Sequence, residues 1–339
     1  MKRIFTLGAA ALAALVALTI SNPGQAQSTW EMNLGSLAPK GTPWTDMLEK
    51  IERNVEAGSD GRINVIIRPP GQMGEVEMVR ETRRGERLQG CGVTTAAFAE
   101  GGNIAQLQVI ELPYLFDNIT EADHVLDNVV WEPLSELMAR RGFVLGIWSE
   151  NGWRSFGTRH KPIRTPEDLK GFKMRAQESD VHMAMYNTFG AQAVQKPMTE
   201  VLTSLQSNVV DGLDQPPLYI KTAGLHEALD YYTLTRIIYQ PAAVAYSKRW
   251  FDTLPEDLQA LVLEQKKLTV EGRVAVREEA AAILDLLRED IEVIELTAEE
   301  REAFVAVAHG MHAEFAASVD GTELYNTIDT ALKEMRAGN

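Results

Sequence analysis

The chain has 339 residues, with 33 Lys and Arg against 48 Asp and Glu, and 45% of the residues are hydrophobic. This composition is too apolar for a disordered chain and too charged for a polytopic membrane protein, and the length favours two lobes. The formal charge of -15 argues against a nucleic-acid partner, because proteins that neutralise phosphates need a basic face.

Residues 1–26 have the pattern of a secretory signal peptide. Lys2 and Arg3 precede an apolar run over residues 4–20, and small residues stand where signal peptidase reads the chain before a cut after Ala26. An uncleaved anchor helix is the alternative, but the run of about 17 residues is short for a span and Pro and Gly follow at once. Cleavage would leave 31 basic and 48 acidic residues, a charge of -17, and an exported mature protein.

The first half of the mature chain alternates strands and helices. The pattern predicts strands over 31–36, 63–67 and 90–94, helices over 44–55, 75–84 and 121–140, and a strand over 143–148. Such alternation implies parallel sheets with helices on their faces. Cys91 lies in the third strand, so we expect a small core residue rather than a reactive thiol, and a single cysteine excludes a multi-thiolate metal site.

The second half is expected to form another lobe from about Asn151. After a short helical turn that starts at Thr165, the predicted strands are 172–176, 209–213, 231–235 and 242–247, and the predicted helices are 180–189 and 199–207. A short strand over 292–296 follows later, and Thr297 with Glu300 forms a capping box that opens a further helix. The last predicted helix includes residues 324–335.

A long helix is predicted between these segments. Thr253 and Glu256 form a capping box around Pro255, and apolar residues hold one face as far as about Asp290. At 1.5 Å per residue, a helix of about 36 residues would be roughly 54 Å long. A helix of that length would have to lie across both lobes.

Signatures of catalysis and of metal binding are missing from the sequence. There is no GxSxG, no HExxH and no Gly-rich phosphate loop. The six histidines are scattered, and only His309 and His312 share a helical face, without a third ligand nearby. We therefore expect no cofactor, no metal and no enzymatic activity.

Polar residues cluster where strands of the second lobe end. Asn151 to Arg154 follow an apolar strand, Arg175 ends another, and Asp211 to Pro216 end a third. Ligands gather at the carboxyl ends of strands in open α/β sheets, and the planar fork of Arg suits a carboxylate. The alternative is that each of these arginines is paired with a structural Asp or Glu.

These segments carry a family resemblance. "RTPEDLKGFKMRAQES", "TEVLTSLQSNVVDGLDQPP" and "YSKRWFDTLPEDLQALV" follow one another in order, preceded by "GQMG", "ELPYLFD" and "NGWRSFGTRHKPI". Together they resemble the extracytoplasmic solute receptors of TRAP transporters, the dicarboxylate-receptor (DctP) type. The resemblance implies an α/β, two-lobed periplasmic binding protein of a type II-like fold, with a long helix crossing both lobes. It also implies a membrane permease with a small and a large subunit as partner.

The resemblance also implies boundaries for the two lobes and a set of ligand-binding residues. Lobe 1 would comprise 27–151 plus about 243–285, and lobe 2 would comprise 152–242 plus about 286–339. Arg175 resembles the family's carboxylate clamp, Arg154 a second basic residue near it, and Gln215 stands where most members have Asn. The other expected ligand-binding residues are Thr94, Met198, Trp153 and Tyr219, with Tyr114 either an aromatic wall or a core residue.

Three functional hypotheses remain open at this point. The first is reversible binding of a small organic acid between the lobes of a receptor that acts as a monomer. The second keeps the receptor fold but has a mainly apolar or lipid-like ligand. The third is a secreted enzyme, which the missing motifs disfavour.

Overall fold

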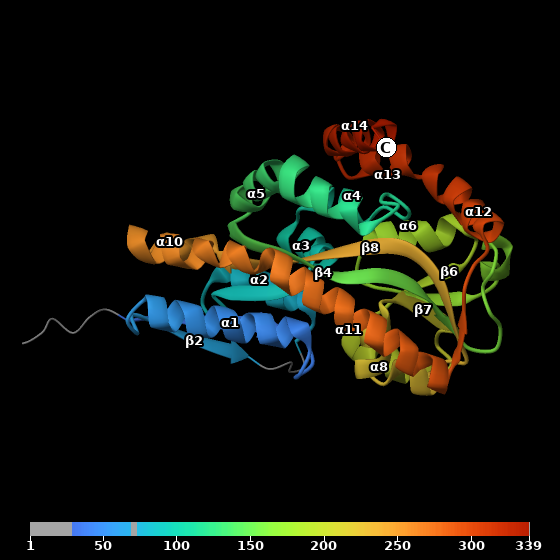
Figure 1. Ribbon diagram of the computed structural model, residues 1–339, viewed down its shortest axis with the longest axis horizontal. Coiled ribbons are helices and arrows are strands. Elements are labelled where there is room, and N and C mark those ends of the chain that lie inside the picture. Colours follow the sequence, from blue (N-terminus) through green and yellow to red (C-terminus); the bar gives the residue numbers. More distant parts are fainter. Residues whose placement is uncertain (1–28, 69–72, 339) are drawn as a thin grey trace, which may run out of the picture.

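The computed structural model describes residues 29–68 and 73–338 (Figure 1). The predicted signal peptide, with its cut after Ala26, lies outside these residues. Within them, no helix combines the length and the apolar character needed to cross a membrane. The strands are β1 (Trp30–Ser36), β2 (Ile63–Arg68), β3 (Gly90–Thr94), β4 (Phe143–Thr158), β5 (Lys173–Ala176), β6 (Gln192–Gln195), β7 (Gly212–Gln215), β8 (Tyr231–Ser247) and β9 (Glu292–Ile294). The helices are α1 (Pro43–Gly58), α2 (Glu75–Arg84), α3 (Thr95–Gly102), α4 (Ile119–His124), α5 (Trp131–Arg140), α6 (Asp180–Thr188), α7 (Val201–Gln206), α8 (Pro217–Thr222), α9 (Lys248–Phe251), α10 (Glu256–Glu264), α11 (Thr269–Asp290), α12 (Ala298–His309), α13 (His312–Ser318) and α14 (Thr322–Ala337).

One mixed sheet organises this α/β fold, in the order β2-β1-β3-β8-β4-β7-β5-β6, with β9 beside β8. β1 pairs in parallel with β2 and β3, and β5 pairs in parallel with β6 and β7. β4 and β8 run antiparallel to each other and to their outer neighbours β7 and β3. The predicted parallel sheets are therefore two halves of one sheet, joined by an antiparallel ribbon that the sequence pattern did not predict.

The two central strands are longer than predicted. The expected strand over 143–148 is the first part of β4, and the two expected strands 231–235 and 242–247 are the ends of a continuous β8. Their pairing is irregular, with register shifts along the ribbon, and this breaks the alternation on which strand prediction depends. One shift lies at Gly152, whose φ of +91° is a conformation that glycine adopts without strain.

The long helix is present, with one interruption. α10 and α11 are separated by a 3-10 turn over Gln265–Leu268, and α11 ends at Asp290 as predicted. The predicted capping box at its start is wrong, because Pro255 is the N-cap and the Thr253 hydroxyl donates to the Trp250 carbonyl oxygen at 2.7 Å. Figure 1 shows α10 and α11 running across both halves of the sheet.

Of two other predicted helical features, the helix over 121–140 is interrupted and the capping box at Thr297 is present. The expected helix over 121–140 is split into α4, a π-helical turn over Val125–Val129, and α5, which restarts with Pro133 in its first turn. The capping box at the start of α12 is confirmed, since the Glu300 amide donates to the Thr297 hydroxyl at 3.2 Å and Glu300 accepts from the Thr297 amide at 2.8 Å.

The C-terminal helices return to the first half of the chain. α13 and α14 pack against residues 105–129, and the Arg336 guanidinium bonds the Glu121 carboxylate at 2.7 Å. A large apolar core continues from this region through the ribbon to α6 and α12, while two smaller cores lie around α1 and around α8. Cys91 is fully buried and burial raises the pKa of its thiol to about 12, so its predicted role as a small core residue is confirmed.

Candidate functional site

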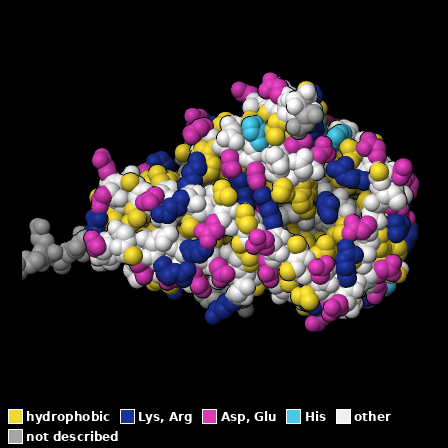
Figure 2. All heavy atoms as spheres, in the orientation of Figure 1, with side chains coloured by type: hydrophobic (Ala, Val, Ile, Leu, Met, Phe, Trp, Pro, Cys, Tyr) yellow, Lys and Arg dark blue, Asp and Glu magenta, His cyan; other side chains and the backbone are white. Residues whose placement is uncertain are grey.

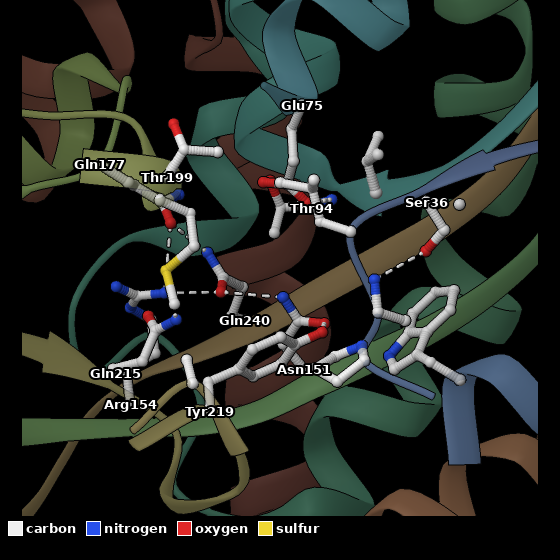
Figure 3. Close-up of a pocket in the computed structure, with 18 of the residues that line it drawn as sticks. Ser36, Glu75, Thr94, Asn151, Arg154, Gln177, Thr199, Gln215, Tyr219 and Gln240 are labelled. Carbon is white, nitrogen blue, oxygen red and sulfur yellow. Dashed lines mark hydrogen bonds between the residues drawn. The ribbon is translucent and has the colours of Figure 1, made fainter. Parts of the chain in front are cut away.

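A cavity of about 210 Å³ lies where the two halves of the sheet meet (Figure 3). We call it the central cavity. Its polar lining residues come from the ends of β1, β3, β5 and β7, from the middle of β4 and β8, from the starts of α2 and α8, and from a 3-10 turn over Met198–Glu200: Ser36, Glu75, Thr94, Asn151, Arg154, Arg175, Gln177, Thr199, Gln215, Tyr219 and Gln240. Apolar side chains, including Leu37, Trp44 and Met198, complete the walls. Six of the seven predicted site residues line this cavity, and Trp153 is the exception.

Arg175, in β5, has a guanidinium whose terminal nitrogens have no partner among the described residues, and we call such a group uncommitted. The side chain is 3% exposed, and its Nε donates to the Lys196 carbonyl oxygen at 2.9 Å. Among the described residues, no carboxylate lies within 4 Å of it and its terminal nitrogens make no hydrogen bond. Burial, with the nearby Arg154 cation, lowers the pKa of Arg175 to about 10, so the group is still charged at neutral pH. A buried cation without a partner is unfavourable, and an anion in the central cavity would relieve this.

Arg154, in β4, is in the opposite situation. Its side chain is 1% exposed and forms an ion pair with the buried carboxylate of Asp214, in the neighbouring strand β7. Its remaining donors reach the Asp214 carbonyl, Gln177 Oε1 at 3.2 Å and Gln240 Oε1 at 2.7 Å. Of the two interpretations of this arginine, the structure supports pairing with a structural Asp.

Asp214 is the centre of a buried polar network beneath the cavity floor. Its carboxylate also accepts from the Tyr186 hydroxyl at 2.6 Å and lies 3.3 Å from His182 Nδ1. His182 Nε2 lies 3.1 Å from Glu111, which also bonds Gln240. Burial alone would raise the pKa of Asp214, but Arg154 and His182 outweigh it and hold the pKa well below its usual range. The network thus fixes Arg154 and Gln240 in position.

Gln215 and Tyr219 extend from the end of β7 and the start of α8. Gln215 Nε2 lies 3.6 Å from the sulfur of Met198, and its buried Oε1 has no partner among the described residues. The Tyr219 hydroxyl donates weakly to Asn151 Oδ1 at 3.4 Å, and Asn151 Nδ2 donates to Gln240 at 3.3 Å. These amides and hydroxyls are uncharged groups that can bond to a ligand's hydroxyl or carbonyl groups.

Glu75 provides the negative charge in the central cavity. It is the first residue of α2, and its carboxylate accepts from the Thr94 amide at 3.2 Å and from the Thr94 hydroxyl at 3.0 Å. Burial raises the pKa of Glu75, and the bonds from Thr94 oppose that change. In Figure 3 Glu75 and Thr94 lie together, across the cavity from Arg154 and Gln215. Glu75, Arg154 and Arg175 are the charged residues among the described cavity walls.

Trp153 lies outside the central cavity. It packs edge-on against Tyr239, with 5.4 Å between ring centroids, and lines a separate groove. Its neighbour Arg154 faces the central cavity instead, as successive residues of a strand should. Tyr114 is a core residue, 1% exposed, whose hydroxyl donates to the Thr235 carbonyl at 3.0 Å.

The sequence pattern places Asn151 only in a polar cluster, and it misses five other polar residues of the central cavity: Ser36, Glu75, Gln177, Thr199 and Gln240. Gln177 could have been predicted, because it comes two residues after Arg175 and side chains two residues apart along a strand point to the same side. The others leave no local signal, since they come from separate elements and their residue types are common on protein surfaces.

Comparisons with known proteins agree with this architecture. The family model described as bacterial extracellular solute-binding protein, family 7, matches residues 34–318. A periplasmic 2,3-diketo-L-gulonate-binding protein of Escherichia coli K12 is 29% identical over 290 residues, covering 83% of this chain and 86% of that protein. The C4-dicarboxylate-binding periplasmic protein of Rhodobacter capsulatus is 28% identical over 332 residues, covering 97% of this chain and 98% of that protein.

Solved structures share the fold. A sugar acid binding protein from Advenella mimigardefordensis, in complex with galactonate, superimposes with a TM-score of 0.84 at 26% identity, covering 90% of this chain and 99% of that one. A TRAP periplasmic solute-binding protein from Polaromonas sp. JS666, bound to D-erythronate, has a TM-score of 0.82 at 26% identity, covering 88% and 98%. The predicted two-lobed α/β architecture is confirmed by this likeness.

Proposed function

The chain belongs to family 7 of the bacterial extracellular solute-binding proteins, and on that premise we propose that it captures a small organic acid in the central cavity for a TRAP permease. Members of this family are transport receptors rather than enzymes, which removes the hypothesis of a secreted enzyme. They are extracytoplasmic and work with membrane permease components. We further propose export through the signal peptide with a cut after Ala26, a monomeric receptor, and a permease of one small and one large subunit.

One observation carries the proposal, namely the uncommitted guanidinium of Arg175. It is buried in the wall of the central cavity, and its terminal nitrogens face no carboxylate of the described chain. A planar fork of this kind binds a carboxylate through two parallel hydrogen bonds. Arg154 is saturated by Asp214, so its proposed role is to hold the cavity floor and contribute charge rather than to grip the ligand.

The remaining walls favour a hydroxylated monocarboxylate. Gln177, Gln215 and Tyr219 are neutral hydrogen-bonding groups, and Gln215 Oε1 is left unpaired. A second carboxylate on the ligand would find no other uncommitted cation in the described walls and would be repelled by Glu75. A mainly apolar ligand is not favoured, because it would leave these polar groups unpaired. Related receptors bind both kinds of acid, since one holds D-erythronate and another is named for C4-dicarboxylates.

Closure of two lobes around the ligand is part of the proposal. We infer that lobe 1 comprises residues 27–151 and about 243–285, and that lobe 2 comprises 152–242 and about 286–309. The sequence-based division placed all of 286–339 in lobe 2, but the packing of α13 and α14 on residues 105–129 supports assigning them to lobe 1. The connections at β4, β8 and α11 would act as the hinge.

A matched set of ligands tests the function. Calorimetry with the wild-type protein should show binding of D-erythronate, weaker binding of succinate, and no measurable binding of the neutral polyol erythritol. The reason is that erythritol keeps hydroxyl groups but lacks the carboxylate that Arg175 would neutralise. If a wider panel of aldonates, uronates and simple carboxylates also gave no binding, or if erythritol bound as well as the acid, the proposal would be wrong.

Replacing Glu75 with glutamine should shift selectivity toward dicarboxylates. Two like charges about 6 Å apart repel by on the order of 3 kcal/mol at an effective dielectric constant of 20, so we expect the succinate affinity to rise about 10- to 100-fold relative to D-erythronate. Calorimetry on Glu75→Gln measures this ratio. Glu77→Gln is the matched control, because Glu77 is exposed on the same helix. An unchanged ratio would show that Glu75 does not select against the second carboxylate.

A further inference from the structure

A second, larger hollow lies on the face of the molecule seen in Figures 1 and 2. It encloses about 770 Å³ between α11 and α12, over the ribbon of β4 and β8, and we call it the α11–α12 groove. Figure 2 shows this region hollowed, with hydrophobic side chains inside it and Lys and Arg side chains beside it. Ligand sites in proteins commonly have volumes of about 300–1,000 Å³.

The walls of the α11–α12 groove are largely apolar. Trp153 and Leu234 form part of its floor, and Val305 lines it from α12. On α11 the lining side chains beyond Arg277 are Ala280, Ala281 and Leu284. The two alanines are short, so this stretch of α11 leaves space where longer side chains would fill the groove.

One cation in this groove is held in an unusual backbone conformation. Arg236 has a φ of +47°, in the left-handed region that is unfavourable for a non-glycine residue. It lies in a bulge of β8, where the register moves from Arg154↔Ile238 to Phe156↔Thr233, and its amide donates to the Ser155 hydroxyl at 3.0 Å. The bulge brings Arg236 to the groove wall.

The charge of Arg236 is uncompensated among the described residues. Its guanidinium makes no hydrogen bond or ion pair there, whereas the other two arginines of the groove are paired. Arg277 bonds Glu150 at 3.0 Å, and Arg301 bonds Asp117 at 3.2 Å. Arg236 and Glu302 are both exposed at the edge of the groove, so water screens both charges. What sets Arg236 apart from the other two arginines is that it has no carboxylate partner in the described residues.

We propose that the α11–α12 groove is a second binding site, for an amphipathic monocarboxylate. The apolar body would lie against Trp153, Leu284 and Val305, and the carboxylate would pair with Arg236. The groove differs from the central cavity in its larger apolar surface, although both linings include amides and carboxylates, such as Asn118 and Glu150 in the groove. The two sites are separate but adjacent: Asn151 lines both, while Trp153 belongs to the groove and Arg154 to the central cavity.

Octanoate is the probe for this site, and the full-length mature protein carrying Arg175→Ala is the background, because that variant disables the central cavity. Calorimetry should show octanoate binding in this background, with little binding of the neutral analogue 1-octanol. Adding Arg236→Gln should weaken octanoate binding at least tenfold. Adding Ala281→Trp should abolish it by filling the groove, and Ala281 is exposed, so its replacement should leave the fold intact.

Three outcomes would overturn the proposal. Wild-type protein that binds no octanoate has no such site. Binding that disappears with Arg175→Ala alone places octanoate in the central cavity. Binding that survives both Arg236→Gln and Ala281→Trp places it elsewhere on the surface. Arg249→Gln, an exposed arginine on α9, serves as the matched control, and thermal unfolding of each variant confirms that it is folded.

Discussion

Replacing Arg175 with alanine is expected to weaken binding of the carboxylate ligand by about 30- to 5,000-fold, which corresponds to roughly 2–5 kcal/mol. The cause is that the ligand's carboxylate would enter the central cavity without the one uncommitted guanidinium of its described walls. Calorimetry with D-erythronate, or with the best acid of the ligand panel, measures the loss. The folded protein should lose little stability, because the substitution removes one hydrogen bond to the Lys196 carbonyl but also a buried charge that has no anionic partner in the described residues.

Two further variants separate charge from geometry. Arg175→Lys keeps the positive charge but lacks the planar fork, so its affinity should fall between those of wild type and Arg175→Ala. Arg164→Ala removes an exposed arginine that pairs with Glu300 and should leave binding unchanged. A loss of less than twofold in Arg175→Ala would contradict the assignment of the clamp.

The position of Arg175 followed from the sequence because a short apolar strand ends there, and strand ends of an α/β sheet meet at one edge. The alternation of strands and helices up to Thr94 was predicted with nearly correct bounds for the same reason. In this part of the chain each helix and strand buries apolar residues at the spacing that its own geometry sets, so local pattern and tertiary structure agree.

The pairing of Arg154 with Asp214 could not be predicted from the sequence. The two residues are 60 positions apart, and they meet because β4 runs antiparallel to β7, where Phe156 lies opposite Asp214. Alternating strands and helices indicate that neighbouring strands are parallel. The pattern therefore predicts neither the antiparallel ribbon nor the ion pair that the ribbon creates. The sequence therefore leaves both interpretations of Arg154 open, and the pairing of β4 with β7 decides between them.

The position of Trp153 shows a second limit of prediction from sequence. Whether a strand residue faces the cavity or the opposite side depends on the count of residues along the strand, and a bulge changes that count by one. Register shifts on either side of Trp153 make its direction unpredictable from sequence. Glu75 was missed for another reason, because a glutamate in the first turn of a helix is ordinarily a favourable partner of the helix dipole.

Replacing Asp214 with asparagine is expected to lower the free energy of unfolding by about 3–5 kcal/mol. Asparagine keeps the size and one oxygen of the side chain but leaves the Arg154 guanidinium buried without its counter-charge. Denaturant unfolding at pH 7 measures the difference. Since Arg154 and His182 hold the pKa of Asp214 well below its usual range, the wild-type advantage is full above the unfolded pKa of about 3.9. It should shrink as the pH falls below that value toward the lower pKa of folded Asp214, because the unfolded chain then binds a proton that the folded protein does not.

Removing both charges distinguishes this mechanism from a simple loss of packing. In Asp214→Asn with Arg154→Met, no unpaired buried cation remains, so a large part of the lost stability should return. If the double variant were no more stable than Asp214→Asn, the cost would come from the Tyr186 and His182 contacts of the carboxylate rather than from the Arg154 charge. Ligand affinity adds an independent readout: an intact Arg175 should still bind carboxylate in the double variant, while a collapse of the cavity floor would remove binding altogether.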